Sequence, residues 1–110
     1  MSSLEQLMID HCPNMTLLVD PASLQIIMAN HAAAQTLGYP RETLLTMSIT
    51  DIESSLQDVF YWEEVRSGQR NPIENQEGLY QCSDTSMLAV TKSIQLVDHQ
   101  ASPLLLVQAK

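Results

Sequence analysis

One charged side chain stands inside an apolar pattern near the C-terminal end of the sequence. Apolar residues recur at every second position from Leu88 to Leu96, and Lys92 falls in the middle of that set. An unpaired buried ammonium is costly, so Lys92 must be paired, reach water along its own stem, or be displaced by a bulge. We weigh two hypotheses: Lys92 neutralises a carboxylate or phosphate ligand in a pocket, or it bulges or reaches solvent at a pocket mouth.

The cysteines and histidines, which could bind metals or form disulfides, are scattered along the sequence. Cys12 and Cys82 are far apart, without a Cys-x-x-Cys pair, and His11, His31 and His99 have no metal-ligand spacing. We therefore expect no metal site, surface or capping roles for the histidines, and reduced thiols, although the sequence leaves a disulfide open.

Catalytic motifs are missing from the sequence. No nucleophile elbow or glycine-rich phosphate loop occurs, and Glu63 with Glu64 reads as an acidic helix surface. We expect that the chain is not an enzyme, and keep an enzyme as a third alternative behind a sensor and an interaction module.

The charge balance excludes two classes of partner. Thirteen Asp and Glu stand against five Lys and Arg, for a formal net charge of −8. Nucleic acids and anionic membranes both require clustered basic residues, so we expect neither as a partner. No apolar run is long enough to span a bilayer and no signal peptide is present, which predicts a cytoplasmic location.

The elements that must position these residues follow from periodicity and turn chemistry. A short amphipathic helix within residues 1–13 is predicted from Leu4, Leu7 and Met8, and a domain over residues 14–110 follows it. Asn30 is a good N-cap for a helix that Gly38 closes, and Pro40 can begin the next helix, which points Leu44 and Leu45 inward. The predicted strands are residues 15–20, 24–29, 79–82, 87–97 and 104–109. This order predicts an α+β domain with an antiparallel sheet and short helices on one face.

A longer helix is expected over residues 55–67. Ile52, Leu56, Val59 and Phe60 fall on one stripe, which we predict faces the core, while Asp58 lies elsewhere.

From Ile27 to Ile52 the sequence resembles the N-terminal half of PAS domains, a family of sensory modules in bacterial signalling proteins. The matching residues are Ile27-Met28-Ala29-Asn30-His31-Ala32-Ala33, Leu37-Gly38-Tyr39, Glu42, Leu44-Leu45 and Ile49-Thr50-Asp51-Ile52, which fit the family patterns I-x-x-x-N-x-A-A and L-G-Y-x-x-E-E-L-L. The C-terminal half agrees by pattern alone, and Asp84-Thr85 stands where the family often has Asp-Gly.

The resemblance implies a five-stranded antiparallel sheet in the order 2-1-5-4-3, with a pocket between sheet and helices. The residues that would line this pocket are Lys92, Leu44, Val59, Phe60, Val90 and Ile94.

The cofactors known in the family are only partly matched. Haem is disfavoured because residues 55–67 contain no histidine, and the light-sensitive type of flavin (FMN) binding is disfavoured because its Asn-Cys-Arg-Phe-Leu-Gln motif is missing. Tyr61 and Trp62 could stack on a flavin or serve as core or dimer contacts. FAD and a small anionic ligand stay open, and the cofactor is unknown.

The resemblance also implies partners. We expect a fragment of a larger two-component or similar protein, which senses a ligand or redox signal and relays it to a histidine kinase or diguanylate cyclase by rearrangement of a homodimer. Leu4, Leu7 and Met8 are the candidate dimer residues. The alternative is a ligand-free interaction module whose interior is filled by its own side chains, since six methionines provide adaptable packing.

Overall fold

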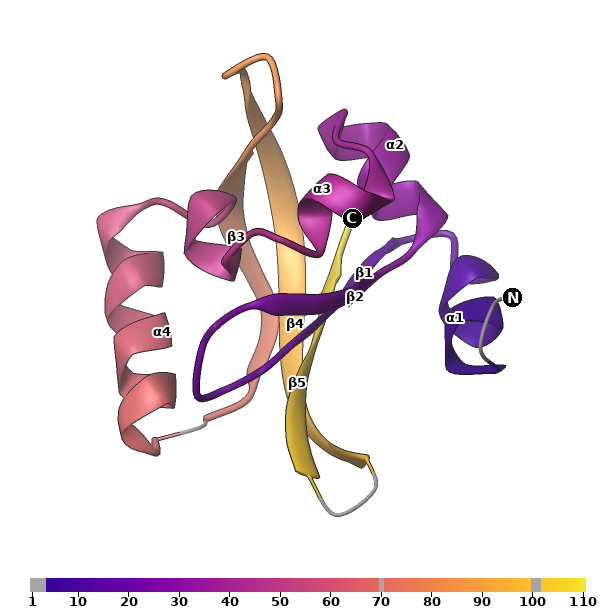
Figure 1. Ribbon diagram of the computed structural model, residues 1–110. Coiled ribbons are helices and arrows are strands. Elements are labelled where there is room, and N and C mark those ends of the chain that lie inside the picture. The colour runs from indigo at the N-terminus through magenta and orange to yellow at the C-terminus, as the bar shows by residue number, and fades with distance from the viewer. Residues whose placement is uncertain (1–3, 70, 100–101) are drawn as a thin grey trace.

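The computed structural model describes residues 4–69, 71–99 and 102–110. Figure 1 shows a twisted sheet with helices packed along it. The elements in chain order are α1 (Leu4–Asp10), β1 (Met15–Val19), β2 (Ile26–Ala29), α2 (His31–Leu37), α3 (Arg41–Leu44), the 3₁₀ helix η1 (Ile49–Asp51), α4 (Leu56–Ser67), β3 (Ile73–Gln81), β4 (Met87–His99) and β5 (Ser102–Ala109).

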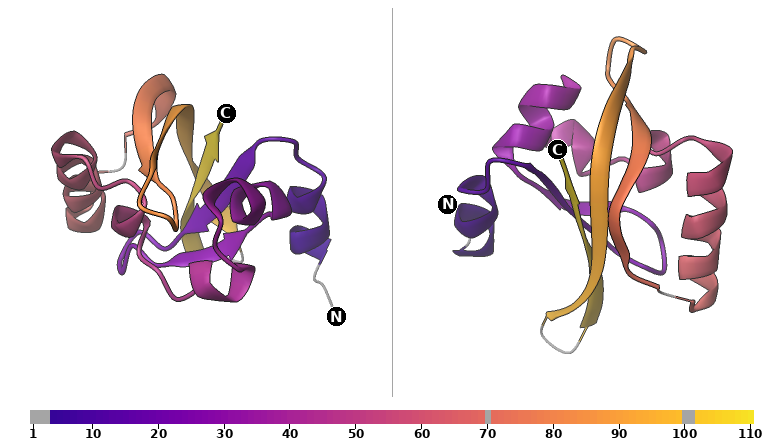
Figure 2. Two further views of the ribbon diagram at one scale, coloured as in Figure 1. Left: turned by 90° about the horizontal axis from the view of Figure 1, so that it is seen from above. Right: turned by 180° about the vertical axis from the view of Figure 1, so that it is seen from behind.

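The five strands form one antiparallel sheet in the order β2-β1-β5-β4-β3. Helices α2, α3 and α4 cover its inner face, whereas α1 stands apart from them beside β2 (Figure 2). The predicted α+β class and strand order are confirmed.

The core follows from the alternation of side chains along the central strands. Over residues 15–19, 90–94 and 105–109, every second residue of β1, β4 and β5 faces the helices, as the period of a strand requires. The helical layer closes the core with Leu37 of α2, Leu44 of α3, Ile52 directly after η1 and Trp62 of α4. The buried residues of these three strands that follow the alternation are Met15, Leu17, Val19, Val90, Lys92, Ile94, Leu105, Val107 and Ala109.

The ends of the short helices agree with local sequence signals. Gly38 closes α2 in the left-handed conformation, with φ +80°, and a Cβ there would lie 2.6 Å from Ser83 Oγ. Helix α3 begins one residue later than predicted, because Pro40 takes an extended conformation, with ψ 148°, and serves as the N-cap.

Strand β3 begins at Ile73, six residues before the predicted start at Leu79. Its first half is polar, and a bulge between Ile73 and Gln76 disturbs the alternation from which a strand is recognised. Asn75 has φ +51° at this bulge and donates its backbone N–H to Ser93 Oγ at 3.1 Å. The early residues belong to an edge strand, which tolerates polar side chains.

The turn from β3 to β4 contains a strained residue. Thr85 has φ +69°, a conformation that costs a residue with a Cβ about 1–2 kcal/mol and glycine far less. Asp84 offsets part of this cost, because its carboxylate accepts the backbone N–H of Ser86 at 2.9 Å. The hairpin keeps the regular pairing of Gln81 with Met87.

Asn30 joins three elements through its side chain. Its Oδ1 accepts the backbone N–H of Thr16 at 3.0 Å and that of Ala33 at 2.9 Å, which caps α2 and fastens β1. Its Nδ2 reaches the carbonyls of Ile9, Cys12 and Asn14 at 2.9, 3.3 and 2.8 Å. The predicted N-cap is confirmed, and the same side chain also anchors the segment that follows α1.

We predict that Asn30→Ala lowers the free energy of unfolding by about 3 kcal/mol, since it removes a cap and leaves buried backbone groups without partners. Urea unfolding followed by circular dichroism measures the loss. Ser55→Ala is the matched control, because Ser55 caps α4 by a single bond to the Asp58 N–H, and its loss should cost about 1 kcal/mol. Equal losses in the two variants would contradict the anchoring role of Asn30.

Candidate functional site

Lys92 lies at the centre of the inner face of the sheet. It is 1% exposed, between the buried residues Val90 and Ile94 on β4. It pairs in regular register with Gln76 on β3 and Ala109 on β5. Lys92 therefore neither bulges out of the strand nor reaches solvent.

Two carboxylates neutralise the buried ammonium. Lys92 Nζ lies 2.7 Å from Glu53 Oε1 and 2.6 Å from Asp58 Oδ1. These three side chains, here called the ion triad, join β4 to the segment after η1 and to the first turn of α4. Charge-assisted bonds of this length are among the stronger side-chain interactions, provided that every buried charge has a partner.

Glu53 is the fixed member of the ion triad. It is 0% exposed, and its Oε1 also accepts the Trp62 Nε1–H at 2.8 Å. Its Oε2 accepts the Tyr80 hydroxyl at 2.8 Å, so both carboxylate oxygens are occupied. Burial, together with the charge of Glu53, raises the pKa of Tyr80 far above its usual value and keeps this hydroxyl a donor.

Asp58 is held less completely. Ser55 caps α4 and thereby places Asp58 in the first turn, where its Oδ1 meets Lys92. Its Oδ2 is buried and accepts no hydrogen bond within the described structure. With both carboxylates ionised, the ion triad carries one negative charge in excess.

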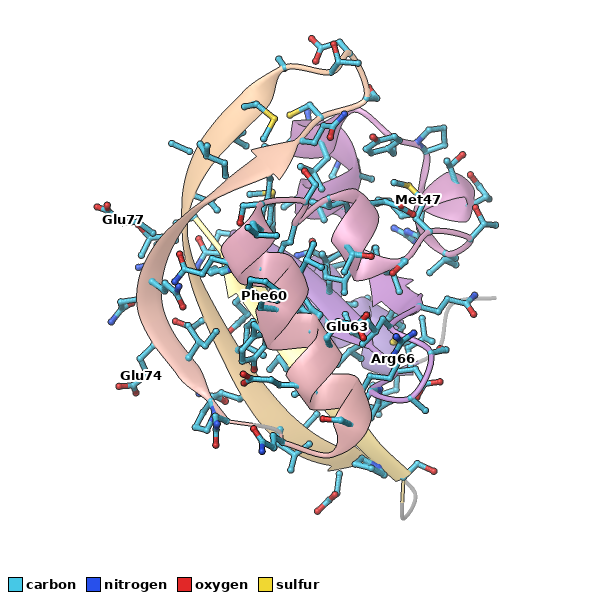
Figure 3. The ribbon with its side chains drawn as sticks, turned by 90° about the vertical axis from the view of Figure 1, so that its left-hand side faces the viewer. Met47, Phe60, Glu63, Arg66, Glu74 and Glu77 are labelled. Carbon is cyan, nitrogen blue, oxygen red and sulfur yellow. The ribbon has the colours of Figure 1, made fainter. Side chains whose placement is uncertain are left out.

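The predicted inward stripe is wrong for Leu56 and Phe60, whereas Ile52 is buried and Val59 is half-buried. Leu56 and Phe60 are exposed, Phe60 by 61%, and Figure 3 shows Phe60 on the side of α4 that faces away from the sheet. The buried residues of α4 are Asp58, Trp62 and Val65. The helix is turned this way because Lys92 requires Asp58, and Glu53 requires Trp62, on the inner side.

The remaining pocket candidates divide between the interior and the surface. Leu44, Val90 and Ile94 belong to one buried apolar cluster. Val59 is half-buried, and Phe60 lies outside. The structure thus places Lys92 beside Val90 and Ile94, but it does not bring Phe60 to them.

Four residues of this site were missed from the sequence: Glu53, Asp58, Trp62 and Tyr80. The single signal was indirect, because a lysine on a buried strand face calls for a counter-charge without naming which of thirteen acidic residues supplies it. Trp62 was considered only as a stacking or contact residue, whereas its indole N–H is engaged by Glu53.

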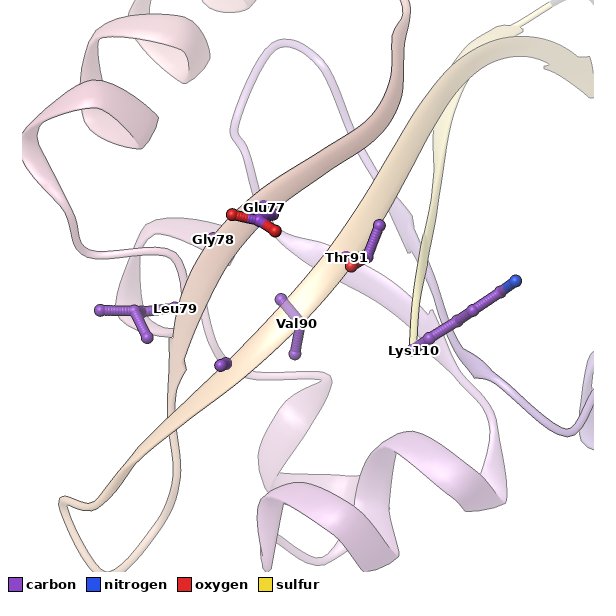
Figure 4. A pocket seen from close by; sticks show the side chains of 7 residues that line it. Glu77, Gly78, Leu79, Val90, Thr91 and Lys110 are labelled. Carbon is purple, nitrogen blue, oxygen red and sulfur yellow. The ribbon is translucent and has the colours of Figure 1, made fainter.

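The described surface hollows lie away from the ion triad. One of about 460 Å³ lies over β3 and β4 beside Lys110, and its labelled lining residues are shown in Figure 4. Lys92, Glu53 and Asp58 line neither this hollow nor the other two described ones. Gly78 separates this hollow from Lys92, since a Cβ on Gly78 would lie 3.6 Å from Lys92 Cε.

The histidines and cysteines take no part in the ion triad. His11 and His31 are exposed, His99 ends β4, and both cysteines are free thiols. Over residues 4–69, 71–99 and 102–110, no three His, Cys, Asp or Glu side chains gather as metal ligands. No helix within these ranges is both long and apolar enough to cross a membrane.

Helix α1 docks by its polar side. Gln6 Nε2 donates to Ala29 O at 3.0 Å, and Asp10 approaches Arg41 at 3.4 Å and accepts the His31 N–H at 2.9 Å. The opposite side carries Leu4, Leu7 and Met8, all exposed. The candidate dimer residues therefore form an open apolar stripe.

We predict that Lys92→Met lowers the free energy of unfolding by about 3–5 kcal/mol, because two buried carboxylates lose their cation. Asp58→Asn should cost less, below about 2 kcal/mol, since Lys92 keeps Glu53 and one oxygen of Asp58 has no partner to lose. Urea unfolding of both variants gives the ranking. An Asp58→Asn loss as large as that of Lys92→Met would show that both carboxylates are equally required.

Comparison with known proteins agrees with this architecture. A family model described as PAS domain matches residues 3–76, more than half of the chain. A comparison with curated protein sequences gives no match.

Solved structures give the same fold at low sequence identity. The PAS domain of an HTR-like protein from Haloarcula marismortui has a TM-score of 0.77 and 22% identity, covering 96% of this chain and 87% of its own. A PAS domain from a two-component sensor histidine kinase has a TM-score of 0.75 and 20% identity, covering 96% and 91%. That of nitrogen regulation protein NR(II) from Vibrio parahaemolyticus has a TM-score of 0.73 and 22% identity, covering 99% and 98%. This chain belongs to the PAS domain family.

Proposed function

We propose that this PAS domain is a cytoplasmic sensory module of a bacterial two-component or related protein, which relays a signal through rearrangement of a homodimer. PAS domains are generally sensory and not catalytic, and similar folds occur in a sensor histidine kinase and in a nitrogen regulation protein. The output domain would be covalently linked, such as a histidine kinase or a diguanylate cyclase.

The observation that carries this proposal is the open stripe on α1. Leu4, Leu7 and Met8 are exposed on a helix whose polar side is fastened to the sheet. Two such stripes facing each other would bury apolar side chains that a monomer leaves in water. The anchoring of α1 through Asn30 and Gln6 then couples the position of this helix to β1 and β2.

We predict that the protein is a homodimer and that Leu7→Glu makes it monomeric, because opposed carboxylates in an apolar interface repel each other and lose hydration. Size-exclusion chromatography with light scattering measures the mass in solution. Leu56→Glu is the matched control: Leu56 is also exposed but lies on α4, so this variant should stay dimeric. A monomeric parent protein, or a Leu7→Glu variant that stays dimeric, would contradict the role of α1.

A second candidate is a ligand-free interaction module. It is favoured by the filled interior, where Trp62, Tyr80 and Lys92 are among the largest fully buried side chains and bind Glu53. In that case the signal arrives through a partner protein.

We predict that the sensor, purified without refolding, shows a greater intact mass under native than under denaturing conditions when its ligand is present in the host cell. Flavin such as FAD would also show visible absorption. A native mass equal to the sum of the chains, obtained from several growth media, would favour the ligand-free module. The native mass also shows whether the protein is a monomer or a dimer.

A further inference from the structure

Among the side-chain nitrogen and oxygen atoms of the described structure, Asp58 Oδ2 is the one that is buried without a hydrogen-bond partner. Buried polar atoms are satisfied in the large majority of cases, and an exception calls for a physical explanation. The explanation lies in the unequal roles of the two carboxylates around Lys92.

Glu53 cannot leave the interior without loss. Its two oxygens accept hydrogen bonds from Lys92, Trp62 and Tyr80, and all three donors would lose their acceptor. Asp58 serves Lys92 alone through its side chain. If Asp58 turns outward, one N–H of the ammonium loses its acceptor, and the unpartnered Oδ2 becomes hydrated.

The position of Asp58 also favours exchange. Its side chain is 6% exposed, compared with 0% for Glu53, and it lies in the first turn of α4. A carboxylate released to solvent there keeps the favourable interaction with the N-terminal end of the helix. Glu53 alone neutralises Lys92, so the departure of Asp58 leaves the buried ammonium with a counter-charge.

We propose that Asp58 occupies a binding position for an external carboxylate at Lys92 Nζ, and that a small monocarboxylate enters the interior by replacing it. This inference rests on the proposed sensory function and names its ligand class. The exchange is one carboxylate for another, so Lys92 keeps its two acceptors and the interior keeps its charge.

Charge selects among anions. A monocarboxylate reproduces the single charge of Asp58, whereas a dianionic phosphate would add a further uncompensated negative charge beside Glu53. A neutral apolar ligand would leave one N–H of Lys92 without an acceptor in a dry interior. The site therefore favours compact monocarboxylates of the size of formate or acetate, which fit the volume left by the Asp58 side chain.

The exchange also supplies a structural response. Without its bond to Lys92, the first turn of α4 loses its ion pair with β4, while Trp62 holds the next turn to Glu53. The movement is thus limited to the beginning of α4. Trp62 is the only tryptophan in the sequence, so its fluorescence reports events at Glu53 without interference.

The test is a titration of the folded wild-type protein with sodium acetate, against sodium chloride at equal ionic strength. We expect a saturable change in Trp62 fluorescence with acetate alone. In Asp58→Ala the position is vacant, and since Asp58 no longer competes, the apparent Kd for acetate should fall at least about tenfold. Acetate should also raise the thermal midpoint of this variant.

The matched control is the double variant Asp58→Ala/Lys92→Met, in which the response to acetate should vanish. A response that survives in this variant, or none in Asp58→Ala, would overturn the site. A response in Asp58→Ala but none in the wild type would overturn the exchange. Should Asp58→Ala not fold, the wild-type titration decides by itself.

Failure of this inference is distinguishable from failure of the sensory proposal. Light scattering in the same titration, with Leu7→Glu alongside, reports the dimer independently of acetate. A protein that forms a Leu7-dependent dimer but does not respond to acetate would contradict the carboxylate site and leave the proposed dimer relay intact. A protein that binds acetate saturably but is monomeric at every acetate concentration would support the carboxylate site and contradict the dimer relay.

Discussion

The burial of one ammonium group constrains much of this structure. Lys92 stands on the inner face of a central strand, where an unpaired charge would cost several kcal/mol, so counter-charges must reach it from the helical layer. Glu53 and Asp58 meet this requirement from the two sides of the α4 cap. The orientation of α4, the burial of Trp62 and the hydrogen bond of Tyr80 all follow from these two contacts.

This constraint explains which parts of the fold the sequence could predict. Asn30 and Gly38 act on residues close by in the chain, and a cap or a left-handed stop is legible from residue type. The sheet order was predictable through the family resemblance of residues 27–52, since periodicity alone does not order strands. The rotation of α4 was not predictable in this way, because it is decided by Lys92, 34 residues beyond Asp58.

The apolar pattern of α4 misleads for a physical reason. Leu56 and Phe60 form a stripe as good as that of Trp62 and Val65, so hydrophobicity does not choose a face. The choice is made by electrostatics: turning Phe60 inward would carry Asp58 into solvent and leave Lys92 with Glu53 alone. By the same reasoning, moving Asp58 outward would change only the first turn of α4 and would leave the fold unchanged.

A direct row of residues connects the ion triad to the anchor of α1. Gln76, Lys92, Ala109 and Met15 are register partners across β3, β4, β5 and β1. Met15 is flanked by Asn14 and Thr16, and both are bonded to the Asn30 side chain that also holds the carbonyl of Ile9 in α1. Such a row carries a signal only if an element at one end has two arrangements with different energies. If Asp58 exchanges, the first turn of α4 is such an element. In one arrangement the Asp58–Lys92 ion pair joins this turn to β4, and in the other the ion pair is broken and the turn is free of the sheet.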